Sequence, residues 1–337
     1  MIIHILWFAL GLVLLIKGGD WFVDGAAGVA KRSGIPDLLI GATVVSIGTT
    51  LPEVMVSATS AAQGYGAMAY GNAIGSIICN TSFIAALTVA LKPQTIDRNE
   101  LRIPVMFFFA AAALYAGVAY ISGDFSRTVG IVLLCMFAGY MTITVKDAFA
   151  EAKRAKESLQ AEAEPEEPEE DTKKEMPLWK MIVLLIIGAA TIALGSKLLV
   201  DHGVALAEGF GVPQTVISLT FVALGTSLPE LVTAITSLRK GHGALSLGNI
   251  CGANLFNLVL VSGISITIGP FTFAKPEFQT LVLGGKEYFS SLIVDTPLMI
   301  IVMAILTLPA LAAGKLKRWQ GILLLAIYAA FCTYQFM

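Results

Sequence analysis

Apolar residues gather in long runs along the chain, and short polar stretches separate the runs. A helix needs about 20 mostly apolar residues to cross the hydrocarbon core of a bilayer, which is about 30 Å thick. The runs lack the alternation with period two of a membrane barrel. They predict an all-α integral membrane protein with ten transmembrane helices, at about residues 2–25, 38–62, 71–91, 102–122, 127–147, 178–200, 214–238, 245–270, 293–312 and 319–336.

Composition supports the membrane assignment and excludes other classes. The 337 residues are 56% hydrophobic and 14% charged, whereas soluble domains are about a quarter charged. We therefore exclude a soluble enzyme, a nucleic-acid binder and a disordered chain, and the sequence indicates no protein partner. The four cysteines, Cys79, Cys135, Cys251 and Cys332, lie in apolar runs without CxxC spacing, so we expect no disulfide scaffold, zinc site or cofactor.

The basic residues predict how the helices are oriented. Of the 22 Lys and Arg residues, 17 lie in loops after odd-numbered runs. The positive-inside rule makes these loops cytoplasmic, so both termini are expected outside a multi-pass protein of the cell membrane. Ten of the 24 acidic residues lie between Glu151 and Glu175. Residues 148–177 are therefore predicted to form an acidic cytoplasmic linker, either a solvated Glu/Pro-rich stretch or a low-affinity collector of cations.

Two parts of the chain resemble each other at one fixed sequence offset, which aligns Gly34 with Gly211. Residues 34–57 match 211–234 at ten of 24 positions, and 71–80 match 248–257 at four of ten. This pattern indicates duplication of a five-helix unit. Because five is odd, the second copy enters the membrane from the opposite side, which is typical of secondary transporters. The predicted units are 1–147 (repeat block 34–82) and 178–337 (repeat block 211–259).

The repeated blocks place polar chemistry in the middle of apolar runs. GTTLPE (48–53) and GTSLPE (225–230) each combine Gly, Pro and an intramembrane glutamate. Pro and Gly weaken a helix, so we expect a helix break at each motif. Carbonyl groups freed at membrane depth must line a cavity or bind something. A carboxylate there costs a few kcal/mol unless it is paired, so Glu53 and Glu230 are functional candidates.

The second motif, GNxxGxxxxN, adds small residues and amides. Gly71, Gly75, Gly248 and Gly252 would let helices approach closely. Further candidate oxygens come from Thr49, Thr50, Thr226, Ser227, Ser76, Asn72, Asn80, Asn249, Asn254 and Asn257. An all-oxygen set suits a hard cation such as Ca²⁺, Mg²⁺ or Na⁺. The two glutamates match one divalent ion, and their charge must be offset again before an emptied site can reorient, which favours exchange over uniport.

These doubled motifs resemble the repeats of the calcium/cation antiporter superfamily, in its sodium/calcium exchanger branch of prokaryotic type. The resemblance implies Ca²⁺/Na⁺ exchange by alternating access, with the first and sixth helices sliding across the rest. It also implies four clustered ion sites. Calcium ligands would be Glu53 and Glu230 with the carbonyls of Thr49 and Thr226. Sodium ligands would be the carbonyls of Ser46 and Ala223 and the side chains of Thr50, Ser227, Ser76, Asn80, Asn254 and Asn257.

Three departures from the family pattern bear on the coupling ion and on regulation. Asn257 stands where some relatives, typically potassium-dependent ones, have Asp, which argues mildly against potassium coupling. Ala253 replaces the serine expected from Ser76, so one hydroxyl is absent. The central loop is too short for the regulatory calcium-binding domains of animal exchangers. Exchange of Ca²⁺ or another cation against H⁺ stays open as the alternative.

Other function classes and other charged residues have weaker support. An intramembrane enzyme using the two glutamates as acid and base would need a nucleophile or a cofactor loop, which the sequence lacks. A channel has no need of duplicated mobile halves. Asp20 could pair with Lys17, and the repeat mates Asp24 and Asp201 could guard an ion entrance or anchor helix ends. Asp295 is expected to cap the ninth helix.

Overall fold

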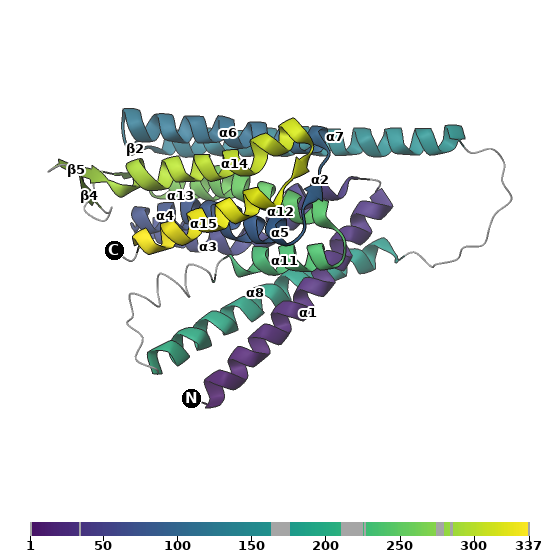
Figure 1. Cartoon of the computed structure of the whole chain (residues 1–337), viewed down its shortest axis with the longest axis horizontal. Helices are drawn as coiled ribbons and strands as arrows, with labels where there is room; N and C mark the ends of the chain where they lie inside the picture. Colours follow the sequence, from purple (N-terminus) through teal and green to yellow (C-terminus); the bar gives the residue numbers. More distant parts are fainter. Residues whose placement is uncertain are drawn as a thin grey trace.

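The computed structural model describes residues 2–33, 35–162, 176–209, 225, 227–273, 280–283 and 286–335. In this part of the chain, eight helices are long and apolar enough to cross a membrane. With two further helices, α11 (Leu228–Arg239) and α15 (Arg318–Gln335), they form an all-helical membrane bundle (Figure 1). The predicted fold class is confirmed.

The first half of the chain follows the predicted runs closely. Its second and third spans are each built from two α-helices joined by a π-helical turn (η). The elements are α1 (Ile2–Ser33), α2 (Asp37–Ile40), η1 (Gly41–Val45), α3 (Ser46–Ala62), α4 (Gly66–Cys79), η2 (Asn80–Ala85), α5 (Ala86–Leu91), β1 (Gln94–Thr95), α6 (Arg98–Ile121), β2 (Asp124–Phe125) and α7 (Arg127–Glu162).

The second half repeats this order and adds a hairpin. Of the seventh predicted run, residues 214–224 lie outside the described residues. The elements are α8 (Leu178–Gly209), α11 (Leu228–Arg239), α12 (Gly243–Phe256), η4 (Asn257–Val261), α13 (Ser262–Ile268), β3 (Phe271–Thr272), β4 (Thr280–Leu283), β5 (Lys286–Phe289), η5 (Ser291–Asp295), α14 (Thr296–Ala313), β6 (Lys315–Leu316) and α15 (Arg318–Gln335).

Helix α7 continues well past the predicted end of the fifth span. It runs to Glu162, through the first half of the segment 148–177 that the sequence assigns to a linker. The added turns read DAFAEAKRAKESLQAE and are rich in Ala, Glu and Lys, which are strong helix formers. The charged residues after the fifth span end the apolar run, but the helix continues through them. Residues 163–175, which hold most of the acidic run, lie outside the described residues.

The two halves end their repeated helices in the same way. Gly64 follows α3 with φ +85° and Gly241 follows α11 with φ +87°. In both turns a backbone N–H reaches a carbonyl five residues earlier, at 2.9 Å for Tyr65 to Ser60 and 2.8 Å for His242 to Ser237. The repeat offset relates each of these positions to its counterpart. Glycine at this left-handed position therefore stops both helices at equivalent points.

Short strands tie the two halves together with the same symmetry. Strand β1, which follows the third span, pairs antiparallel with β6, which precedes the tenth. Strand β3, which follows the eighth span, pairs antiparallel with β2, which precedes the fifth. Each half therefore contributes the same two positions to the opposite half. This is the pairing expected of two copies related by an axis in the membrane plane.

Helices α1 and α8 form a closely packed pair. A Cβ on Gly25 would lie 2.7 Å from the Met181 carbonyl oxygen, and one on Gly188 would lie 2.6 Å from the Phe22 nitrogen. Such contact is possible only because these positions are glycines. Figure 1 shows the pair crossing obliquely beneath the rest of the bundle, with its two ends at different distances from it.

The expected helix break at the first GTxLPE motif is wrong. Helix α3 runs unbroken through Pro52, because a proline removes only one backbone hydrogen bond, here the one to the Gly48 carbonyl. The irregularity lies one turn earlier, in η1. In the second copy, α11 begins at Leu228 with Pro229 in its first turn, where a missing N–H costs little.

Close approach at the repeat glycines is confirmed for the second copy. A Cβ on Gly248 would overlap the Leu38 carbonyl oxygen, and one on Gly252 would overlap the Ser46 hydroxyl. Helix α12 thereby packs directly on the second span. For Gly71 and Gly75, no heavy atom of the described residues lies within 4 Å of a Cβ.

The Gly248 contact predicts a stability effect. Gly248→Ala should destabilise the protein by about 1–3 kcal/mol, because backbone atoms of α2 must move to admit the methyl group. Thermal unfolding in detergent measures the loss. Gly117→Ala in α6 is the matched control, since no described heavy atom lies within 4 Å of its Cβ. Equal unfolding temperatures for the two variants would contradict the packing argument.

Candidate functional site

Two fully buried glutamates lie at the centre of the site. Glu53 is in the middle of α3 and Glu230 is in the first turn of α11, and both side chains are 0% exposed. The two helices contact each other, and the carboxylates are close enough for their charges to interact. No described residue donates a hydrogen bond to any of their four carboxylate oxygens. Such a pair is costly to bury without a cation.

Buried hydroxyl groups lie on the same two helices as the carboxylates. Ser46, Thr49 and Thr50 of α3 and Ser227 at the start of α11 are all buried. The Thr49 hydroxyl donates to Asn249 Oδ1 at 3.2 Å, and the Ser46 hydroxyl lies 2.9 Å from the Asn249 main-chain oxygen. The hydroxyls of Thr50 and Ser227 have no hydrogen-bond partner among the described residues. These two oxygens are therefore free to face a ligand.

Three buried asparagines add amide oxygens from both halves. Asn80 and Asn257 are repeat mates, and each is the first residue of a π-helical turn, η2 or η4. Asn254 donates its Nδ2 to the Thr81 hydroxyl at 2.7 Å, which leaves its Oδ1 without a partner in the described part of the chain. Both amide atoms of Asn80 and of Asn257 are likewise buried and unpartnered there. π-Helical turns recur at functional sites.

The asparagines of the two GN pairs brace α3 from two different helices, α4 and α12. Asn72 of α4 donates Nδ2 to the Ser57 hydroxyl at 2.8 Å and to the Glu53 carbonyl oxygen at 3.3 Å. Its repeat mate Asn249 accepts from Thr49, as described above. Ligand assignment by resemblance did not include these two residues. The GNxxG motif identified both residues as candidate polar groups in apolar runs. Only the three-dimensional packing shows that they brace α3.

The structure brings most of the predicted ligands together. The contacting elements α3, α4, η2, α11, α12 and η4 carry Ser46, Thr49, Thr50, Glu53, Ser76, Asn80, Ser227, Glu230, Asn254 and Asn257. Ala223 and Thr226 lie outside the described residues. Within the described part of the chain, no three His, Cys, Asp or Glu residues gather. The candidate donors are carboxylate, amide and hydroxyl oxygens, which suit hard cations.

Three of the other charged candidates form ion pairs in the structure. Asp20 and Asp24 both contact Lys240 from the end of α11. Asp201 pairs with Lys197, one turn earlier on α8, at 2.8 Å. Asp295 precedes α14 but makes no capping hydrogen bond with its side chain, so the predicted cap is wrong. Its backbone is helical, because η5 continues directly into α14, and a helix that does not start there needs no cap.

Comparison with known proteins identifies the family. The family model "Sodium/calcium exchanger protein" matches residues 3–146 and 180–337. The sodium/calcium exchanger MaX1 of Methanosarcina acetivorans is 30% identical over 364 residues, covering 99% of each chain. The inner membrane protein YrbG of Escherichia coli is 37% identical over 262 residues, covering 77% of this chain and 78% of its own.

A solved structure extends the similarity to three dimensions. The sodium-calcium exchanger NCX_Mj, soaked with 10 mM Na⁺ and zero Ca²⁺, superposes with a TM-score of 0.78 at 30% identity. The match covers 98% of this chain and 97% of that one. Sequence, fold and site agree, and the chain is a multi-pass transporter that belongs to the sodium/calcium exchanger family.

Proposed function

We propose that this protein exchanges Ca²⁺ for Na⁺ across the membrane by alternating access, with the ions bound at the midplane. One observation carries the proposal: two buried carboxylates, to which no described residue donates a hydrogen bond, lie on contacting helices, and the neighbouring elements carry buried amide and hydroxyl oxygens. Both repeats contribute to the set. A bound cation supplies the missing partner for these oxygens.

The ligands divide by charge. A divalent ion needs the two carboxylates, so Ca²⁺ is assigned to Glu53 and Glu230 with the carbonyls of Thr49 and Thr226. Na⁺ is proposed to bind neutral oxygens beside the two glutamates. The proposed sodium ligands are the carbonyls of Ser46 and Ala223 and the side chains of Thr50, Ser227, Ser76, Asn80, Asn254 and Asn257.

Charge balance makes exchange the natural mode of transport. When Ca²⁺ leaves, two buried negative charges remain, and moving them to the other side without a cation carries a cost of several kcal/mol. Sodium ions reduce that cost by occupying the same set of oxygens. The site therefore reorients readily when loaded with either ion and poorly when empty. The sequence-based alternative, coupling to H⁺, would balance the same charges by protonation.

Orientation follows from the basic loops. We propose that the end of the bundle where α7 ends and α8 begins, at the right of Figure 1, is cytoplasmic, and that the protein lies in the cell membrane with both termini outside. Units 1–147 and 178–337 are then inverted repeats, with the acidic linker on the cytoplasmic side.

Removing either carboxylate should abolish exchange. Glu53→Gln and Glu230→Gln each leave one negative charge for a divalent ion, so we expect at least a 100-fold loss of Na⁺-driven Ca²⁺ uptake into proteoliposomes, which is about 2.7 kcal/mol. Folding is checked by size-exclusion chromatography. Asp124→Asn, at an exposed strand position, is the control with normal uptake. Wild-type flux in either glutamine variant would refute the site.

The coupling ion is tested with gradients. Proteoliposomes loaded with Na⁺, K⁺ or buffer of lower pH, and diluted into Ca²⁺, should take up Ca²⁺ only with the outward Na⁺ gradient. The reason is that the neutral oxygens around the glutamates suit Na⁺. Uptake driven by the pH gradient alone would instead support proton coupling, and uptake with no trans cation would contradict exchange altogether.

The brace on α3 should tune affinity. Thr49→Val and Asn249→Leu each break the 3.2 Å hydrogen bond between these residues, so each should weaken apparent Ca²⁺ affinity by about two- to tenfold, as expected for the loss of one such bond. The double variant should lose little more than either single one, because the same bond is already broken. Additive losses in uptake assays would show that the two residues act separately.

A further inference from the structure

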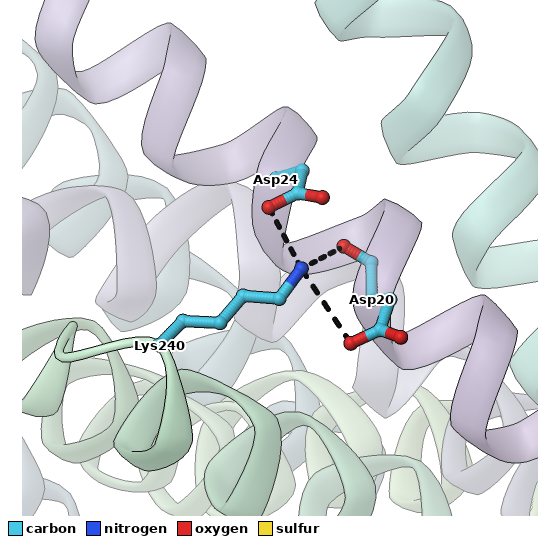
Figure 2. Close-up of polar contacts among 3 residues, drawn as sticks. All are labelled: Asp20, Asp24 and Lys240. Carbon is cyan, nitrogen blue, oxygen red and sulfur yellow. Dashed lines mark hydrogen bonds and ion pairs between the residues drawn. The ribbon is translucent and has the colours of Figure 1, made fainter.

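One lysine connects α1 to the rest of the bundle. The Nζ of Lys240 lies 2.7 Å from Asp24 Oδ1 and 3.5 Å from Asp20 Oδ1, and it donates to the Asp20 carbonyl oxygen at 2.9 Å (Figure 2). Lys240 directly follows α11, immediately before the Gly241 turn. The two aspartates lie one turn apart on the same face of α1. We call these three residues the latch.

The latch joins two parts of the molecule that are packed differently. Helix α1 is bound to α8 by backbone contacts at glycines, as described above. Against α11, by contrast, α1 packs through side chains: a Cβ on Gly19 would lie 2.7 Å from Val232 Cγ1 and 3.0 Å from the Thr236 hydroxyl. The α1–α8 pair therefore behaves as one body, and the latch lies across its boundary with the other helices.

The latch has no counterpart in the repeat-related position at the opposite end. The repeat offset places Gln63 at the position of Lys240 and Lys197 at that of Asp20. Gln63 has no charge, and it precedes the equivalent turn at Gly64. Lys197 forms its ion pair within α8, with Asp201 at 2.8 Å. The two repeats therefore share the glutamates and the Asn80/Asn257 pair and differ in the charges at these two ends.

The asymmetry matches the observed position of the α1–α8 pair. Figure 1 shows the pair diverging from the bundle toward the N-terminus of α1 and meeting the bundle at its other end. Lys240 lies between α11 and α12, in a loop that is cytoplasmic in the proposed orientation. By the proposed orientation the divergent end is extracellular. The latch therefore holds the cytoplasmic end closed while the extracellular end of the pair stands apart.

We propose that Lys240, through Asp20 and Asp24, is a positioning residue that fixes the cytoplasmic end of the α1–α8 pair and favours the outward-facing arrangement. This inference rests on the proposed alternating access. The contact is built to be reversible, because the side chains are 27% exposed for Lys240, 31% for Asp20 and 51% for Asp24. Partly solvated ion pairs shift an equilibrium by only about two- to fivefold, and salt weakens them.

The test measures the arrangement directly. Spin labels at Ile5→Cys on α1 and Ile121→Cys on α6, both exposed positions, report the distance between the pair and the bundle. Cys135 and Cys332 are first replaced by alanine, because both are accessible to label, whereas Cys79 and Cys251 are buried. Electron–electron resonance in liposomes then gives the populations of long and short distances.

Lys240→Gln introduces the residue that the other repeat has at this position. It should lower the ratio of the long-distance to the short-distance population about two- to fivefold. Asp20→Asn/Asp24→Asn should do the same, and adding Lys240→Gln to it should change little. Raised salt should reproduce the shift in the wild type and not in Lys240→Gln. The control is His242→Gln, which breaks the 2.8 Å pair to Asp37 between α12 and α2, both within the bundle, and should leave the ratio unchanged.

The mirrored variant Gln63→Lys/Lys197→Asp places the same three charges at the opposite end and should shift the ratio the same way, by drawing in the extracellular end. Unchanged distances in Lys240→Gln, with normal folding, would overturn the latch. Because distance is measured without transport, failure of Ca²⁺ uptake would refute the proposed function alone, and unchanged distances would refute the latch alone.

Discussion

Burial of two carboxylates in a membrane is the constraint on which the rest of this structure depends. Glu53 and Glu230 are completely excluded from solvent and have no donor among the described residues. Each such group carries a desolvation cost of several kcal/mol, which falls only when a cation is nearby. The fold must therefore hold the two helices together against electrostatic repulsion, and it does so with packing from elsewhere. Close contacts at Gly41, Gly248 and Gly252 lock the second span onto α12.

The bracing of α3 follows from the same constraint. A helix that carries a buried charge and an internal proline loses rigidity at the point where the ligand atoms must be placed accurately. Asn72 and Asn249 restore it with hydrogen bonds from two different helices. The π-helical turns begin at Asn80 and Asn257, whose buried amides have no hydrogen-bond partner among the described residues.

The pattern of residues along the chain predicted the features that depend on neighbouring residues in the sequence. The apolar runs gave most span limits within a few residues, and the repeat offset located both glutamates and the paired asparagines. The pattern misplaced the helix break, because the effect of Pro52 depends on what the neighbouring helices supply. It ended the fifth span at the last apolar residue, whereas α7 continues as a charged helix to Glu162. It also could not pair Asp20 and Asp24 with Lys240, in the other half of the chain, because that contact arises only from how α1 crosses α11.

An inverted duplication creates a difficulty that this molecule resolves at its ends. Two equivalent halves give two arrangements of similar energy, which alternating access requires, but perfect symmetry would leave no preferred resting state. The glutamates and the strand pairs keep the symmetry, because the proposed ion site and the bundle framework draw on both halves. The exposed helix ends can differ at no cost to the site, and there Lys240 and Gln63 do differ. Weak, solvated contacts are suited to setting such a preference, since a strong one would trap the transporter in a single arrangement and stop the cycle.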